Sequence, residues 1–218
     1  MKRKDLLEII EKGESLNCEF KRKFSTHEKI AKEMIAFANT NGGVILFGVD
    51  DNKEIVGVDS EKTEVELVKE TAENYCIPPL QYEVEFVDVN GKEIVIVNIP
   101  ESKNKPHRLQ DYLKKFDITK AVVFIRVNDK SMQASKEMMR IMRAESENLK
   151  LKKYSIGDIE KNAFEYLDKN ETITVRDLSE LVNISARRAS RTLVKMVRAK
   201  LLMIHTKENG EEYFTSRT

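Results

Sequence analysis

Cysteine is scarce in this sequence, with Cys18 and Cys76 the only two among 218 residues. Two cysteines do not build a disulfide framework, and their separation matches no metal-ligand spacing. The three histidines, at positions 27, 107 and 205, share no ligand spacing either, so no zinc site is expected. These absences favour a reducing, intracellular location, and we expect the protein to be cytoplasmic.

Long apolar runs are also absent. No run approaches the ~18 residues that a membrane-spanning helix requires, and residues 1–4 precede an amphipathic pattern rather than a signal core. We therefore expect a soluble protein with no membrane partner. A Gly-x4-Gly-Lys-Ser/Thr motif is missing as well, so the chain has no such loop to hold the phosphates of a nucleotide, and ATP is not expected as a cofactor.

The chain has no excess of either charge. Lys and Arg number 38 against 37 Asp and Glu, which gives a net charge of +1. Total charge therefore does not indicate a nucleic-acid partner, and any basic surface has to be local. The length of 218 residues is enough for one or two domains with a sizeable core.

The most informative stretch runs from Glu14 to Asp51. Its centre, residues 26–40, has apolar residues at the spacing of one buried helix face. Gly42 and Gly43 end that helix, and the apolar run 44–49 is typical of a buried strand. Asp51 follows the strand at its carboxyl end, where functional groups tend to gather. We expect this arrangement to bring Glu14, Glu19 and an aspartate together at one sheet edge.

The same stretch resembles a known family. Glu14-x4-Glu19-Phe-Lys, then Phe37-Ala-Asn-Thr-x-Gly-Gly43 and Gly48-Val-Asp-Asp51, is similar to the Schlafen AlbA-type domain. Pro106-His107, the strand 123–127 and Ser131-x2-Ala-Ser135 extend the resemblance over about residues 4–140. It implies an α+β fold, with a mixed sheet and helices packed on it.

Periodicity predicts the other elements of a first domain spanning residues 1–148. Asn90-Gly91 between two alternating runs is a strong hairpin signal. The expected helices are 4–12, 26–40, 62–76 and 135–148, and the expected strands are 17–24, 44–49, 54–58, 82–89, 93–99 and 121–127.

A basic segment without periodicity, residues 149–153, is interpreted as a linker to a second domain at 154–218. Helices are expected at 159–167, after the capping signal Thr174-x-x-Asp177, and from Ser185 to Lys200. A two-stranded hairpin follows, with strands 201–204 and 212–214. Three helices followed by a hairpin resemble a winged helix-turn-helix domain.

The resemblance assigns a role to the carboxylates. Glu14, Glu19 and Asp51 match the three-carboxylate, metal-dependent centre of eukaryotic Schlafen nucleases, and such oxygen ligands suit Mg²⁺ or Mn²⁺. The alternative is that these acidic residues only shape strand ends and turns.

Two groups of basic residues are candidates for nucleic-acid binding. Lys21, Arg22 and Lys23 follow Glu19 and could hold phosphates, with Arg126 as a companion, although the first three could be merely solubilising and Arg126 could form an internal ion pair. In the third C-terminal helix, Arg187, Arg191 and Lys195 are spaced i, i+4, i+8 on one face. Arg188 lies beside them, and Lys207 lies in the expected wing. This pattern is typical of a recognition helix, although winged helices also bind proteins.

These observations favour a nucleic-acid-binding protein, a DNA-binding transcriptional regulator, with DNA or RNA as partner. The alternatives are a Mg²⁺- or Mn²⁺-dependent endoribonuclease acting on tRNA or rRNA, and a protein-interaction adaptor. Winged helices usually bind two-fold symmetric sites as pairs. Because Schlafen cores use two lobes in one chain and this chain has one, we expect a homodimer.

Overall fold

The computed structural model describes residues 1–147 and 154–217, which form two compact units, Met1–Ala134 and Ser135–Thr218. The predicted linker 149–153 lies outside the described residues. The division places the helix after Ser135 in the second unit, one helix earlier than the predicted boundary at residue 148. In the part of the chain that the structure describes, no helix has both the length and the apolar character needed to cross a bilayer.

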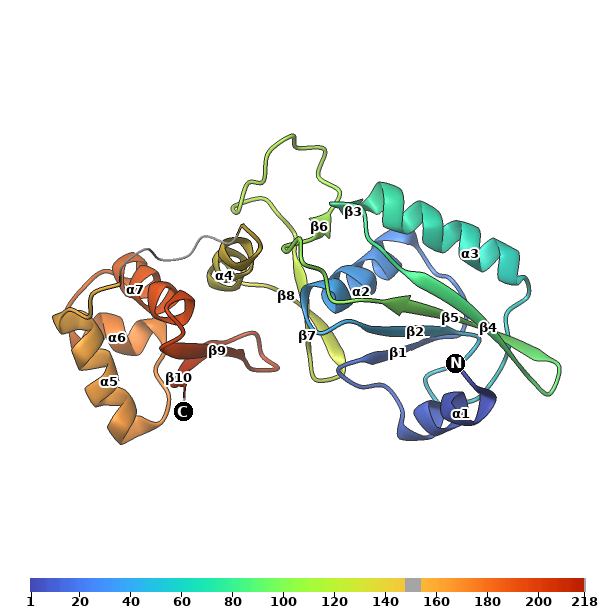
Figure 1. Ribbon diagram of the computed structural model, residues 1–218, viewed down its shortest axis with the longest axis horizontal. Coiled ribbons are helices and arrows are strands. Elements are labelled where there is room, and N and C mark those ends of the chain that lie inside the picture. The colour runs from blue at the N-terminus through green and yellow to red at the C-terminus, as the bar shows by residue number, and fades with distance from the viewer. Residues whose placement is uncertain (148–153, 218) are drawn as a thin grey trace. The chain divides into compact units, whose positions relative to one another are not determined.

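A four-stranded sheet of order β1-β2-β5-β4 forms the centre of the first unit (Figure 1). β1 (Cys18–Lys21) runs parallel to β2 (Gly43–Phe47), and Glu19 lies opposite Ile45. β5 (Lys92–Ile99) pairs antiparallel with both β2 and β4 (Glu83–Val89). The Asn90-Gly91 turn between β4 and β5 confirms the predicted hairpin, and both of its residues have positive φ.

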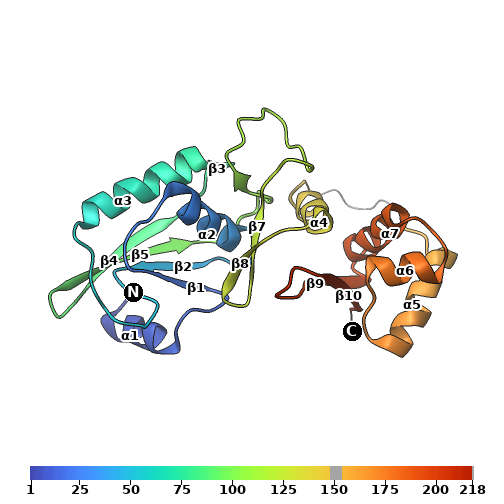
Figure 2. The ribbon, with the colours of Figure 1, turned by 180° about the vertical axis from the view of Figure 1, so that it is seen from behind.

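Helices cover both faces of this sheet, as Figures 1 and 2 show. α2 (His27–Asn39), capped by Thr26, packs on one face, and α1 (Arg3–Lys12) packs on the other. β5 is buried on both sides because its successive residues alternate between two cores: Val95 and Val97 contact the α2 layer, and Ile94 and Ile96 contact the α1 layer. Such a strand reads as one continuous apolar run.

The close approach of α2 to β2 requires the two glycines between them. Gly42 has a φ of 70°, and a Cβ there would lie 2.8 Å from the backbone of Glu101. A Cβ on Gly43 would overlap the ring of Phe37. The chain can therefore turn from helix to strand at this point only without side chains, which fixes where Glu19 lies relative to the helix.

The remaining elements of the first unit differ in part from the prediction. The expected strand 54–58 is reduced to one bridge between Val49 and Ile55. α3 (Glu61–Glu70) continues as a π-helical turn, Thr71–Tyr75, which accounts for the predicted helix 62–76. The two-stranded pairs β3–β6 (Cys76–Ile77, Arg108–Leu109) and β7–β8 (Phe124–Val127, Lys130–Gln133) complete the unit. Together with the family resemblance described above, these elements confirm an α+β fold.

The second unit contains helices and one hairpin. α4 (Lys136–Ser146) packs against α7 (Ala186–Arg198), and α5 (Asp158–Asn170) and α6 (Val175–Leu181) complete the helical part. β9 (Leu202–Thr206) and β10 (Glu212–Ser216) form the antiparallel hairpin. Thr174 and Asp177 form the predicted reciprocal cap of α6. The core collects one face of α5, α6 and α7, together with Leu202 and Phe214 from the hairpin.

Candidate nucleic-acid interface and carboxylate cluster

The three predicted carboxylates lie in one neighbourhood of the first unit. Glu14 precedes β1 and accepts a hydrogen bond from the backbone N–H of Phe20 at 2.9 Å. Burial raises the pKa of Glu14 above its usual value, and the negative charges of Glu19 and Asp51 add to this rise. The Phe20 hydrogen bond opposes it. The folded chain therefore brings Glu14, Glu19 and Asp51 close enough for their charges to interact.

Glu19 is engaged by cations on both carboxylate oxygens. Lys21 Nζ contacts Oε1 at 2.5 Å, and Arg126 Nη1 contacts Oε2 at 2.8 Å. The Glu19 residue is only 8% exposed. Its charge is compensated within the protein, as buried carboxylates require.

Arg126 is the centre of a buried ionic network. Its side chain is fully buried and also contacts Glu33 Oε2 at 3.1 Å, and its Nη2 donates to the carbonyl of Ser15 at 2.7 Å. The guanidinium lies 4.7 Å from the centre of the Phe37 ring, and Ser131 donates a short hydrogen bond to Glu33. Arg126 therefore forms the internal ion pairs that were the alternative to a nucleic-acid contact, and the contact itself stays a prediction.

These residues do not fit a divalent cation in this arrangement. Mg²⁺ and Mn²⁺ need carboxylate oxygens that are free to coordinate, whereas both oxygens of Glu19 are bonded to cations. Among residues 1–147 and 154–217, no group of three or more His, Cys, Asp or Glu side chains is arranged to hold a metal ion. Asp51 is exposed, and the neighbouring Asp50 shapes the turn by accepting hydrogen bonds from the backbone N–H groups of residues 52 and 54.

The basic segment after Glu19 divides into two parts. Lys21 is the last residue of β1, and its ammonium group bonds Glu19 and the carbonyl of Phe20. Arg22 and Lys23 follow the strand and are exposed. Of the four basic residues predicted in the first domain, Arg22 and Lys23 are the two with exposed side chains, and the charge of Lys23 also acts on the buried carboxyl of Glu64.

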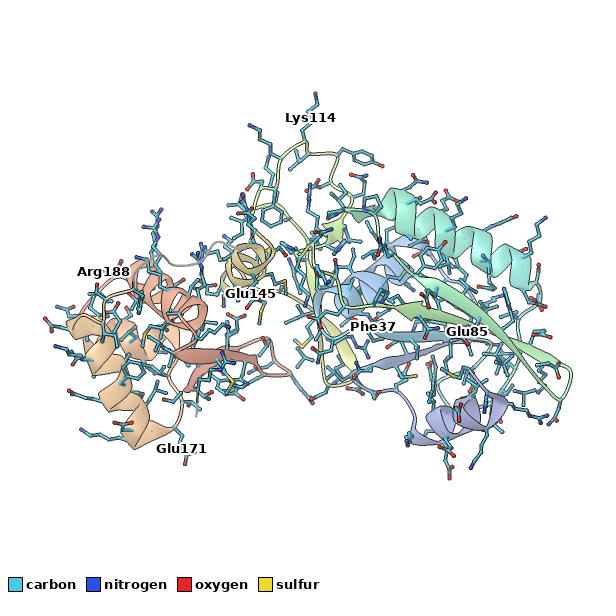
Figure 3. The ribbon with its side chains drawn as sticks, in the orientation of Figure 1. Phe37, Glu85, Lys114, Glu145, Glu171 and Arg188 are labelled. Carbon is cyan, nitrogen blue, oxygen red and sulfur yellow. The ribbon has the colours of Figure 1, made fainter. Side chains whose placement is uncertain are left out.

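The predicted basic face of α7 is present in the second unit. Ser185 caps the helix by accepting from the backbone N–H of Arg188, and the opposite face packs Ala189, Leu193 and Met196 into the core. The exposed face presents Arg187, Arg188, Arg191 and Lys195; Figure 3 labels Arg188. None of these four side chains forms a hydrogen bond or ion pair with another described residue.

An open cavity of about 740 Å³ lies beside this basic face. The four cations line it on one side, and the first residues of α5 from Gly157 to Glu160 line it on the other. The guanidinium groups attract anions, whereas the α5 side of the cavity carries the carboxylates of Asp158 and Glu160. In the hairpin, Lys207 is exposed but pairs with Glu211 at 2.8 Å, and it lies 5.8 Å from the Tyr213 ring centre.

Sequence reasoning missed two buried polar residues, one in the Arg126 network and one outside it. Glu33 lies on the apolar face of α2 between Ile30 and Phe37. A charged residue on an apolar helix face is the sequence signal that could have identified it as a buried ion-pair partner. Asn39 is the other: its side chain binds the backbone N–H and C=O of His107 and the carbonyl of Phe124, at 2.8–2.9 Å. His107 is itself buried between the Pro78 carbonyl and Ser102, and burial lowers its pKa.

Comparison with known proteins shows a family for most of the first unit. The model of the family Schlafen, AlbA_2 matches residues 14–135, more than half of the chain. The solution structure of the N-terminal domain of a RecG-related protein from Nitrosomonas europaea is 25% identical, covers 51% of this chain and 81% of that chain, and has a TM-score of 0.43. The crystal structure of the DIP2311 protein from Corynebacterium diphtheriae is 17% identical and also has a TM-score of 0.43, covering 60% of this chain and 27% of that one. TM-scores of this size support no conclusion about function.

Proposed function

This chain belongs to the Schlafen AlbA_2 family, and from that premise we propose that it is a nucleic-acid-binding protein, a transcriptional regulator whose C-terminal unit is a winged helix-turn-helix that binds duplex DNA. In this proposal α7 is the recognition helix and the β9–β10 hairpin is the wing. The observation that carries the proposal is the set of four exposed cations on α7 with no acidic partner among the described residues.

Charge distribution supports this role over a purely structural one. Among the described residues, an exposed basic side chain that forms an ion pair does so with an acid within about one helical turn. Arg176 and Glu180 are an example. α7 instead presents Arg187, Arg191 and Lys195 in a row along one face. An uncompensated row of cations on one helix is the electrostatic pattern that binds a phosphate backbone, with Arg also able to bind guanine edges.

We expect Arg187→Ala and Arg191→Ala each to weaken binding to duplex DNA about tenfold, because each removes a phosphate or base contact of roughly 1–3 kcal/mol. The salt dependence should become shallower by about one charge per substitution. Fluorescence anisotropy with labelled duplex DNA at several salt concentrations measures both quantities.

Lys169→Ala is the matched control, since Lys169 is an exposed cation in the last turn of α5, away from the basic face. It should bind DNA as the wild type does. Equal affinities for wild type, Arg187→Ala and Arg191→Ala would contradict the recognition-helix role and favour the adaptor alternative, in which α7 docks a protein.

The first unit is proposed to add a second phosphate-binding surface through Arg22 and Lys23. Both are exposed and adjacent, and they follow directly from a strand whose position is fixed by the buried network. A Lys at such a position acts as a point charge for phosphate, and an Arg can bind it through two donors.

The chain is also proposed to act as a homodimer. One winged helix reads one half-site, and pairing two copies would match a two-fold symmetric operator. Sedimentation velocity at micromolar concentration should show a dimer. A strict monomer, both free and bound to DNA, would rule this out.

The endoribonuclease alternative is favoured by one observation, the proximity of Glu14, Glu19 and Asp51. Because Glu19 is neutralised by Lys21 and Arg126, we expect tRNA incubated with the protein and Mn²⁺ to remain intact. Gel electrophoresis of tRNA with Mn²⁺ or EDTA checks this. Cleavage that requires Mn²⁺ and disappears in Glu19→Ala would make the nuclease the leading function instead.

A further inference from the structure

The loop between β6 and β7 presents one aromatic side chain to solvent. Tyr112 is 89% exposed, the highest exposure among the large hydrophobic side chains of the described residues. Leu113 beside it is 36% exposed. The loop extends away from the sheet in Figure 1, and Figure 3 shows Lys114 at its apex with the side chain pointing outward.

This loop is held in place by a buried ion pair at its base. Arg108, only 6% exposed, donates to both oxygens of Asp111 and to the carbonyl of Leu113. Asp111 in turn accepts the backbone N–H of Leu113, and Gln110 accepts that of Tyr112 at 3.0 Å. The backbone on both sides of Tyr112 is therefore fixed, although the ring itself is not packed.

Tyr112 also adopts a backbone conformation that is unfavourable for its residue type. Its φ is 56°, in the left-handed region that glycine and asparagine occupy more easily than aromatic residues. Tyr112 gains little burial and is held with positive φ, so asparagine at this position would contribute as much to folding. Its side chain is therefore better explained by a binding role.

Two lysines follow the ring. Lys114 and Lys115 are exposed, and neither forms an ion pair or hydrogen bond with another described residue. The acid nearest to them in sequence on one side, Asp111, is paired with Arg108, and Asp117 on the other side accepts two hydrogen bonds from Thr119 and interacts with the charge of Lys120. A single exposed ring next to uncompensated cations is the combination that stacks a base and holds the adjoining phosphates.

We propose that the Tyr112 loop, residues 110–116, is a binding site for single-stranded nucleic acid, in which Tyr112 stacks on an unpaired base and Lys114 and Lys115 contact the flanking phosphates. The site lies in the other unit from α7, and it requires unstacked bases rather than a duplex. A membrane is the less suitable partner, because Phe116, the second aromatic of the loop, lies 5.6 Å from the Arg108 guanidinium instead of extending outward with Tyr112.

The test measures binding of fluorescein-labelled oligouridylate and oligothymidylate by anisotropy. Tyr112→Asn should weaken binding about tenfold through the loss of one stacked base, while its thermal unfolding midpoint stays the same or rises because asparagine tolerates the positive φ. Tyr112→Phe should bind as the wild type does, since stacking needs the ring and not the hydroxyl. Lys114→Ala should weaken binding and make it less dependent on salt.

Phe86→Ala is the matched control, because Phe86 is a 49% exposed aromatic on β4 of the same unit. It should leave single-strand binding unchanged. Each variant is also made in an Arg187→Ala/Arg191→Ala chain, so that loss of duplex binding through α7 and loss of single-strand binding through the loop are scored separately.

Single-strand affinity in Tyr112→Asn within twofold of the wild type would overturn the proposal. The proposal would also be overturned if the wild-type chain bound neither oligouridylate nor oligothymidylate. Sedimentation with phosphatidylserine-containing vesicles that is lost in Tyr112→Asn, without single-strand binding, would overturn it in favour of a membrane contact. A stably folded Tyr112→Asn chain with weakened single-strand binding and intact duplex binding would establish it.

Discussion

Replacing Arg126 by methionine should lower the free energy of unfolding of the first unit by about 3–5 kcal/mol. The substitution keeps most of the side-chain volume but removes the cation that lies between Glu19 and Glu33, both less than 10% exposed. Two buried carboxylates would then lose their shared partner, and the carbonyl of Ser15 would keep only the backbone N–H of Cys18, at 3.4 Å. The cost comes mainly from the charges that remain rather than from the contact that is lost.

The measurement is urea denaturation followed by circular dichroism, with amide hydrogen exchange in β1 and β7 to assign the change to the first unit. Arg22→Met is the control, since it removes an exposed arginine from the same unit and should change stability by less than about 0.5 kcal/mol. Adding Glu33→Leu to Arg126→Met should recover part of the loss, because it removes a buried carboxylate that would otherwise keep only the half-exposed Lys32 as a cationic partner, at 3.6 Å. Equal stability of Arg126→Met and Arg22→Met would show that the network contributes little.

The second unit should lose stability as the pH rises through neutrality, and Glu212 is the cause. Burial raises the pKa of this carboxyl from 4.5 to about 7, the nearby charge of Glu137 adds to the rise, and a hydrogen bond from Ser135 opposes it. Below pH 4.5 the group is protonated both folded and unfolded. Between 4.5 and about 7 the folded chain holds a proton that the unfolded chain has released, so the free energy of unfolding falls as the pH rises through this range and levels off above it.

We expect Glu212→Gln to be more stable than the wild type by about 3.5 kcal/mol at pH 8, from a shift of about 2.5 pKa units at about 1.4 kcal/mol per unit, and nearly equal to it at pH 4.5. Thermal or urea unfolding across this pH range measures the difference. Glu165→Gln, an exposed carboxylate in α5, should show no such pH dependence. A Glu212→Gln chain whose stability follows the wild type at every pH would place the ionisation of Glu212 outside this range.

The carboxyl responsible for the pH effect lies between the hairpin and α4 in the proposed DNA-binding unit. Ser135, the donor to Glu212, is also the N-cap of α4, and Glu137 of α4 accepts a short hydrogen bond from Ser190 of α7. Glu212 lies in β10, the second strand of the hairpin. The carboxyl thus connects the hairpin to the helix that packs against α7, within one unit.

Much of the fold was determined by local sequence signals. The Asn90-Gly91 turn between two alternating runs, the Thr174–Asp177 cap and the apolar spacing of α2 each specify an element whose physical cause lies within a few residues. The basic face of α7 could be predicted for the same reason, since residues four apart share a face on any helix. The two glycines after α2 predicted the end of that helix, whereas the close approach that excludes a Cβ at both positions is a feature of the tertiary structure.

Only the tertiary structure decided which charges are available. Lys21, Arg22, Lys23 and Arg126 are equivalent as basic residues in the sequence, yet Arg126 is fully buried between acids 93 and 107 residues away, while Arg22 and Lys23 remain exposed. The same holds for Glu19, whose two cationic partners remove it from the predicted metal ligands. Periodicity predicts the face on which a side chain lies. The ion-pair partner of a charged side chain depends on strands and helices that meet only when the chain folds. Whether the charge can bind a ligand is therefore determined by the tertiary structure.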